Sequence, residues 1–330
     1  MKRMYAIAAI GLTLCAWGGH AWANVVIDTV TVGNAGNPPD MRYGSPGYGA
    51  VDYVYQIGKF EITAGQYTEL LNAVAAADTY DLYNPLMASA NGGCNIQRHG
   101  SPGSYTYSVA PDWADRPVTY ISWGDAARFC NWLHNGQPTG PQGPGTTEDG
   151  SYFLNGATTN TELMAVVRKP GATWVIPSEH EWYKAAYHKN DGPTGHYYDY
   201  PTRSDIAPSN DLIDPDPGNN ANYYSDGYTI GAPYYRTVVG EFENSYSPYG
   251  TFDQAGNVWE FTEGIIDPEH RALRGGSFNS IWQTNLHAGH HYTYDPTEEF
   301  WDVAFRVAVV PEPGTAALLV LGVLVTVRRR

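Results

Sequence analysis

Basic side chains are scarce in this sequence. Its 330 residues include 19 Lys and Arg against 34 Asp and Glu, a formal net charge of −15. Proteins bind nucleic-acid phosphates through a basic face, so the deficit argues against a nucleic-acid partner. Charged residues make up only 16% of the chain and hydrophobic residues 42%, a balance that rules out a wholly disordered protein.

Cysteine is nearly absent as well. Cys15 lies in an N-terminal apolar run, which leaves Cys94 and Cys130 with a single disulfide that they could form. Such a bond would persist outside the cell. Cys130 falls on an apolar helix face, so buried free thiols are the alternative. The spacing does not decide between the two.

Glycine, proline and aromatic residues are abundant instead. The 36 Gly and 23 Pro residues together make up about 18% of the chain, which favours many turns over a helical bundle. Aromatic residues reach 14%, with 26 Tyr and 10 Trp. We therefore expect a loop-rich fold packed by rings, or broad amphipathic surfaces.

The first 23 residues have the features of a secretory signal. Lys2 and Arg3 precede an apolar run over residues 5–17, and residues 21–23 read A-W-A, a cleavage pattern. The run is too short for a membrane-spanning helix. The sequence therefore predicts a signal peptide over residues 1–23 and an exported protein.

The last 20 residues form a second separate segment. Residues 311–313 read P-E-P, residues 315–327 are apolar, and the chain ends in three arginines. This arrangement resembles the PEP-CTERM sorting tail of exported bacterial proteins. The resemblance implies recognition by an exosortase-type protease. It also implies transient membrane contact through residues 311–330 and a final place at the cell surface or in the extracellular matrix.

Length alone allows about two domains, but the pattern between the two ends predicts one α+β domain over residues 24–310. Strands are expected at residues 25–32 and, as strand, turn and strand around Gly58, at residues 51–62. Residues 137–150 read as a loop, and residues 190–249 as long irregular stretches. No internal repeat is evident.

Three helices share one start signal. In each, a hydroxyl residue precedes the helix, and an amide or acidic residue follows three positions later, as in a capping box. Apolar residues then recur at helical spacing. The three pairs are Thr63 with Gln66, Ser122 with Asp125, and Ser178 with Glu181.

Six segments in a recognisable order carry a family resemblance. They are residues 57–63 (IGKFEIT), 116–123 (RPVTYISW), 175–182 (VIPSEHEW), 249–261 (YGTFDQAGNVWEF), 274–278 (RGGSF) and 305–308 (FRVA). Together they resemble the formylglycine-generating enzyme family, or sulfatase-modifying factor domain, over nearly the whole core. The resemblance implies a loop-rich variant of the C-type lectin-like fold. The motifs identify a fold better than a chemistry, because Ser178 can act as a helix cap. Trp182, Trp259 and Phe278 can likewise be core rings.

The resemblance also implies calcium. One site corresponds to the side chains of Asp253 and Glu260 with the carbonyls of Gly256 and Val258. Calcium prefers oxygen ligands from flexible loops, and this spacing supplies them. The alternative is an aspartate turn cap and a glutamate paired with arginine.

A second calcium site corresponds to Asn222, the Tyr223 carbonyl, Asp226 and the Tyr228 carbonyl. Its spacing is compressed relative to many members of the family.

The copper ligands of the family are missing. Its enzymes use two cysteines, just after R-G-G-S, to bind copper(I) and oxidise a sulfatase cysteine to formylglycine. Here those positions are Ser280 and Asn285, and no cysteine follows Cys130. Serine and asparagine cannot replace soft thiolates, so copper is not expected.

Nearby His287, His290 and His291 could in principle hold another metal. If this segment is a strand, however, His290 and His291 would point to opposite faces.

Two functions therefore remain open. The first is an exported, calcium-stabilised binding or structural module that lacks the copper pair and takes a glycan or protein ligand. The second is an oxidoreductase of the formylglycine-generating type that works through a rearranged metal site. The identity of the ligand and the oligomeric state cannot be derived from the sequence.

Overall fold

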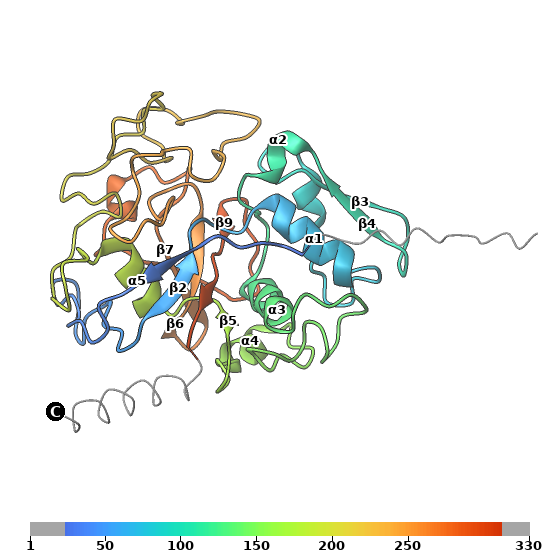
Figure 1. The fold of residues 1–330 in the computed structure, drawn as a ribbon. Helices are drawn as coiled ribbons and strands as arrows, with labels where there is room; N and C mark the ends of the chain where they lie inside the picture. The colour runs from blue at the N-terminus through green and yellow to red at the C-terminus, as the bar shows by residue number, and fades with distance from the viewer. Residues whose placement is uncertain (1–23, 312–330) are drawn as a thin grey trace, which may run out of the picture.

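A computed structural model describes residues 24–311 (Figure 1). The predicted signal and all but the first residue of the predicted tail lie outside these residues. The helices are short: α1 (Ala64–Val74), α2 (Pro111–Ala114), α3 (Trp123–His134), α4 (Asn160–Ala165) and α5 (Glu179–Tyr187). Single 3₁₀ turns lie at η1 (Pro85–Ala88) and η2 (Gln283–Leu286). None of the helices within residues 24–311 is long and apolar enough to cross a membrane.

The strands form three small sheets. One has the order β1-β2-β10-β5 and consists of Thr29–Val32, Tyr55–Gly58, Ala308–Val309 and Trp174–Val175. A second has the order β8-β7-β6-β9 and consists of Tyr292–Tyr294, His270–Arg274, Trp259–Asp267 and Val303–Ala304. The third is the hairpin of β3 (Ile96–His99) and β4 (Thr106–Val109). The result is a mixed fold of small helices and sheets.

The three predicted helices are confirmed with their caps. Thr63, Ser122 and Ser178 each accept a hydrogen bond from the backbone of the third helical residue, whose side chain bonds back to the cap. A fourth capping box, Thr159 with Glu162, begins α4. It was not predicted, because a helix of six residues is too short to show an apolar period.

The strand predictions are correct only in part. Within residues 25–32 the strand is limited to Thr29–Val32. The expected strand, turn and strand over residues 51–62 is wrong, because one strand, Tyr55–Gly58, is all that forms there. After Gly58 the backbone bonds to separate segments, with Lys59 N donating to Asp28 O and Ile62 N to Phe305 O. Because these two backbone hydrogen bonds go to different segments, they do not build the ladder that a second strand would need.

Aromatic side chains fill much of the core, as their abundance in the sequence predicts, and two cysteines lie among them. Trp123, Phe129 and Phe305 are fully buried in the main cluster, where the Phe129 and Phe305 rings meet edge to face with centroids 5.5 Å apart. Cys94 and Cys130 are both buried and free, so no disulfide joins them. Burial raises the pKa of both thiols.

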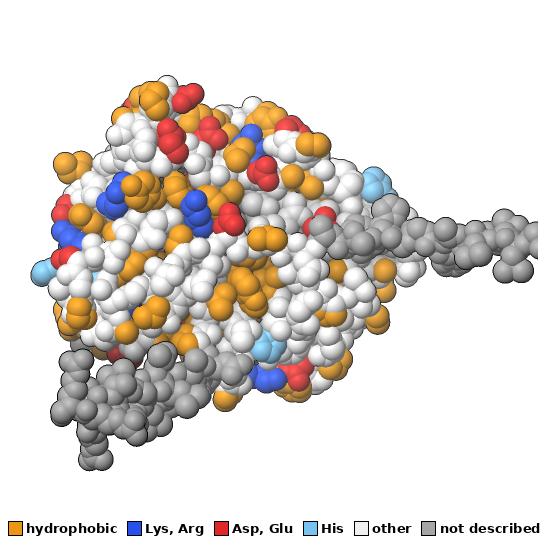
Figure 2. Space-filling model, in the orientation of Figure 1, with side chains coloured by type: hydrophobic (Ala, Val, Ile, Leu, Met, Phe, Trp, Pro, Cys, Tyr) orange, Lys and Arg blue, Asp and Glu red, His pale blue; other side chains and the backbone are white. Residues whose placement is uncertain are grey.

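The segment between α5 and β6 is irregular, as predicted. In Figure 1 it appears as the yellow and light-orange loops that cover one end of the molecule. Figure 2 shows this face with acidic, basic and apolar side chains intermixed on a mainly uncharged surface. The loops contribute a small second core, in which Tyr223, Ala255 and Leu286 are buried together.

A half-buried acidic side chain, Glu299, gives the fold a pH dependence. Burial and the nearby Asp125 raise the pKa of Glu299 from 4.5 to about 8, while a hydrogen bond from Asn84 opposes the shift. The folded chain therefore keeps a proton that the unfolded chain loses, and stability falls as pH rises from about 4.5 to 8.

We expect Glu299→Gln to be more stable than the parent by about 1 kcal/mol or more at pH 9 and equal to it at pH 4.5. Urea unfolding at both pH values measures this. The matched control is Glu298→Gln at the exposed neighbour, which should leave the free energy of unfolding unchanged at both pH values. A parent with the same stability at pH 4.5 and 9 would contradict the assignment.

Candidate functional site in the loops around β6 and β7

The loop before β6 is shaped by positive backbone angles. Asp253, Gly256 and Asn257 have φ of 60°, 80° and 59°. Gly256 lies against the 222 loop so closely that a Cβ there would stand 2.2 Å from Asn222 O, and Asn257 N donates to that same oxygen at 2.8 Å. The structure therefore places one member of each predicted calcium set side by side.

Glu260 at the start of β6 has protein partners on both of its carboxylate oxygens. Its carboxylate accepts from Arg306 Nε and Nη2, both at 2.6 Å, and from Trp182 Nε1 at 2.7 Å. Glu260 and Arg306 are completely buried. Arg306 also donates to Phe252 O at 2.9 Å and Gly58 O at 3.0 Å. Four of the six family segments thus meet around one bidentate ion pair.

Two further carboxyl groups lie close enough to interact with this pair. Asp253 Oδ2 accepts from Gly240 N at 2.6 Å. Burial raises the pKa of Asp253 to about 6, with Glu260 adding to the rise and Arg306 opposing it. Glu61 is 1% exposed, and neither of its carboxylate oxygens has a hydrogen-bond partner. Burial, and then the charge of Asp253, raise its pKa well above the usual range. The positive charge of Arg306 therefore interacts with three carboxyl groups, those of Glu260, Asp253 and Glu61.

The residues of the second predicted ligand set differ in burial. Asn222 is buried, and its Nδ2 donates to Tyr235 O at 2.9 Å and to Asn257 Oδ1 at 3.0 Å, while its Oδ1 has no partner. Asp226 and Tyr228 lie at the exposed end of the loop.

A neighbouring asparagine holds this loop. Asn210 Nδ2 donates to the carbonyls of Tyr223, Ser225 and Gly227 at 3.2, 3.3 and 3.0 Å. The amide group therefore sits among several of the loop's carbonyls. No sequence pattern pointed to Asn210, because the bonds join positions that differ by 13 to 17 residues.

The two positions that the resemblance matches to the family's cysteines, Ser280 and Asn285, are held by ordinary hydrogen bonds. Ser280 is 7% exposed, and its Oγ accepts from Ser277 N at 3.0 Å. Asn285 Nδ2 contacts His290 Nε2 at 3.1 Å. Tyr224 N donates to Ser280 O at 3.1 Å, so the predicted second calcium loop docks on this turn. Neither side chain offers a thiolate.

The three nearby histidines have different surroundings. The His287 ring lies edge-on to Tyr43 and Tyr200, with centroids 5.1 and 5.3 Å away. The His290 ring lies 5.8 Å from Trp259. Burial lowers the pKa of His290 and His291, and the positive charge of Arg274 lowers both further. The neutral form is therefore favoured for both rings.

Within residues 24–311 no three His, Cys, Asp or Glu side chains are grouped so that they could hold a metal ion. The predicted calcium sets depend on fewer charged ligands. The first needs two carboxylates and two backbone carbonyls, and the second one carboxylate, one amide and two carbonyls. Neither predicted calcium set therefore requires three grouped acidic side chains.

The fold and the site define a loop-rich α+β protein in which glycine turns and a buried Glu260–Arg306 pair hold the loops around β6 and β7 together. Residues 46–310 match the family described as the sulfatase-modifying factor enzyme 1-like domain. The match covers well over half of the chain, and the protein belongs to this family. No curated protein matches the sequence.

Solved structures share the fold at low sequence identity. A crystal structure of CarF has a TM-score of 0.50 and 20% identity, over 87% of this chain and 99% of that one. The Treponema denticola variable protein 1 has a TM-score of 0.50 and 17% identity, over 86% of this chain and 95% of that one. At such identities the likeness shows the fold alone.

Proposed function

We propose that this protein is a non-catalytic binding module, exported and held at the cell surface by its C-terminal tail, on a calcium-stabilised variant of the C-type lectin-like fold. The observation that supports it best is the turn after R-G-G-S. Ser280 is buried and hydrogen-bonded there, and Asn285 pairs with a histidine. The thiolates that copper(I) requires are absent from both positions.

The surface beside this turn suits a ligand. Ile281 and Trp282 are 60% and 66% exposed, and Tyr228, 38% exposed, reaches Asn279 with its hydroxyl. Exposed rings with few charges suit the apolar faces of sugars or the core of a protein interface. Three parts of the proposal depend only on the two end segments of the sequence. They are export, recognition by a sorting protease, and membrane contact through the tail.

The residues of the first predicted calcium set fit a hard cation. All its ligands are oxygens, and the carboxyl groups of Asp253, Glu260 and Glu61 outnumber the one buried arginine. Each carboxylate oxygen has two lone pairs, so Glu260 Oε1, which accepts one bond from Arg306, retains capacity for a cation. Calcium bound there would offset the buried negative charge.

Removing the Asp253 charge should have opposite effects with and without calcium. In chelator, Asp253→Asn should be more stable than the parent at pH 7.5 by roughly 1 to 2 kcal/mol, since ionising Asp253 costs stability as pH rises from 3.8 toward 6. With calcium, the parent should gain stability and the variant should not. Calorimetric melting temperatures measure both.

The control for this experiment is Asp52→Asn, which removes the same charge from an exposed position outside the site. It should keep the parent's response to calcium. If calcium stabilises Asp253→Asn as much as it does the parent, then calcium does not bind at this loop.

Elemental analysis separates the two functions directly. The purified protein is incubated with calcium, and separately with copper(I) under reductant, then desalted and its metal counted per chain. One or two calcium ions without copper supports the binding module. Stoichiometric copper, followed by oxygen consumption with a cysteine peptide, would establish the oxidoreductase instead.

A further inference from the structure

The described fold ends beside β5. Strand β10 pairs with β5, and Val310 N, just after β10, donates to Thr173 O at 3.0 Å. In Figure 1 the coloured ribbon ends on the same side of the molecule as β5 and α4, while the loops between α5 and β6 cover the opposite end. The chain therefore leaves the described fold at the face that carries β5 and α4.

Two large apolar side chains are exposed on this face. Phe153 is 59% exposed and Val167 is 68% exposed. Their neighbours Tyr152 and Arg168 form an antiparallel bridge. Both neighbours are directed inward, where Glu263 Oε1 accepts from the Tyr152 hydroxyl at 2.6 Å and from Arg168 Nε at 2.9 Å. Because side chains alternate along extended backbone, Phe153 and Val167 point outward together.

These two side chains line a shallow groove of about 490 Å³ along α4. The other apolar side chains that line it are Leu154, Ala157, Ala165 and Val166. A turn in which Ala172 N donates to Lys169 O at 3.2 Å joins the groove to Thr173. Among the described residues of the groove, Lys169 is paired with Asp149, and Glu162 adds a negative charge. A partner would therefore contact this groove through apolar surface rather than through acidic groups.

The apolar stretch of the predicted tail begins a short way beyond this face. Residues 312–314 read E-P-G, and residues 315–327 are apolar. From Pro311 to Thr315 even a fully extended chain spans at most about 14 Å. That is less than half of the roughly 30 Å thickness of a bilayer's hydrocarbon core. If residues 315–327 enter a membrane, as proposed above, the face with Phe153 and Val167 must lie close to the membrane surface.

The groove is too small to cover the apolar stretch itself. A volume of about 490 Å³ suits a ligand of drug size, whereas residues 315–327 are 13 residues long. A membrane interface has no such limit, and it accepts aromatic and apolar side chains beside an inserted segment. Of these two occupants, the membrane therefore fits the groove better.

We propose that this face of the protein lies on the membrane, with the side chains of Phe153 and Val167 inserted into the lipid interface. The proposal rests on the tail's membrane contact proposed above and adds which surface of the domain faces the lipid. The loops between α5 and β6, which include Tyr228 of the proposed ligand surface, then face away from the membrane. A ligand in solution could reach them there.

The test uses residues 24–330 and vesicles of phosphatidylcholine, a lipid without net charge. Phe153→Cys and Val167→Cys each carry an environment-sensitive fluorophore. Because Cys94 and Cys130 are buried and their pKa values are raised, the label should react with the introduced thiol alone. We expect the emission of both labels to shift to shorter wavelength when vesicles are added, and nitroxide-bearing lipids to quench it.

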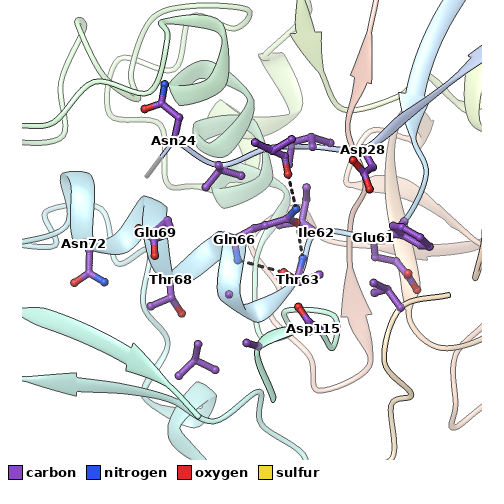
Figure 3. A pocket seen from close by; sticks show the side chains of 18 of the residues that line it. Asn24, Asp28, Glu61, Ile62, Thr63, Gln66, Thr68, Glu69, Asn72 and Asp115 are labelled. Carbon is purple, nitrogen blue, oxygen red and sulfur yellow. Dashed lines mark hydrogen bonds between the residues drawn. The ribbon is translucent and has the colours of Figure 1, made fainter. Parts of the chain in front are cut away.

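Val26→Cys is the matched control. Val26 is 76% exposed and lines a separate cavity of about 800 Å³ between the N-terminal segment, the start of α1 and β4 (Figure 3). In Figure 1 both α1 and β4 lie away from the point where the coloured ribbon ends. Vesicles should therefore neither shift nor quench a label at this position.

Vesicle flotation measures how much the contact contributes. Phe153→Ser should lower the partition of residues 24–330 onto vesicles about tenfold, because the variant no longer buries an aromatic ring in the interface. Val26→Ser should leave the partition unchanged. Because both side chains are exposed, both variants should fold normally.

The outcomes separate this inference from the proposed function. If the parent does not float with the vesicles, the tail's membrane contact is wrong and this inference fails with it. If the parent floats but the labels at positions 153 and 167 behave like the label at position 26, the tail's contact stands and the proposed orientation is wrong. Labels that are shielded from water before vesicles are added would show that the protein itself covers the groove, which also overturns the proposal.

Discussion

Arg306→Met should lower the free energy of unfolding by about 3–5 kcal/mol, the usual cost of removing one partner from a buried ion pair. Arg306 is completely buried, makes a bidentate pair with Glu260 and also holds the carbonyls of Phe252 and Gly58. Without it, Glu260, Asp253 and Glu61 lose their shared cation. Urea unfolding at pH 7.5 measures the change.

The loss should depend on the carboxylates rather than on packing alone. Adding Glu260→Gln to Arg306→Met should recover part of the stability, since it removes the charge left unpaired. The single variant should also lose less at pH 5, because protonation of Asp253, whose pKa is about 6, reduces the unpaired charge. Arg203→Met, at an exposed arginine, is the control and should cost less than about 1 kcal/mol.

A loss equal to that of the control, or a double variant no more stable than the single one, would contradict this account. The charge of Arg306 would then not be what the surrounding carboxylates require.

Local signals predicted the parts of the fold that local physics controls. The caps of α1, α3 and α5 depend on residues three apart, and all three predictions are confirmed. Family membership followed from the R-G-G-S and G-N-V-W-E segments. The limits of the strands were not predictable, because β2 pairs with β1 and with β10, which lies some 250 residues away in the sequence.

The candidate site, too, was predictable only where neighbouring residues carried a signal. The positive φ of Gly256 fits a glycine in a turn, and the alternative that Glu260 pairs with an arginine was weighed from sequence. The partner Arg306 could not be named, since the two lie 46 residues apart. Asn210 carried no local signal at all. Contacts between distant loops appear only when the fold brings them together.

Gly256→Ala should be nearly as damaging as Arg306→Met, for a steric reason. At φ of 80° any side chain is strained, and the added Cβ would stand 2.2 Å from Asn222 O. Because that oxygen also accepts from Asn257 N, the loop cannot move away without losing a buried bond. We expect a loss of about 3 kcal/mol or more.

Gly36→Ala separates the cost of backbone strain from the cost of steric overlap. Gly36 has nearly the same φ, 78°, but nothing lies within 4 Å of its added Cβ, so the substitution should cost only about 1 kcal/mol. The excess at Gly256 then measures the contact between the two predicted calcium loops.

Hydrogen exchange gives the local readout. The Asn257 amide should lose protection in Gly256→Ala and keep it in Gly36→Ala. Equal costs for the two alanines, with Asn257 still protected, would show that the 222 and 256 loops can separate freely. A ligand bound at one loop would then have no structural route to the other.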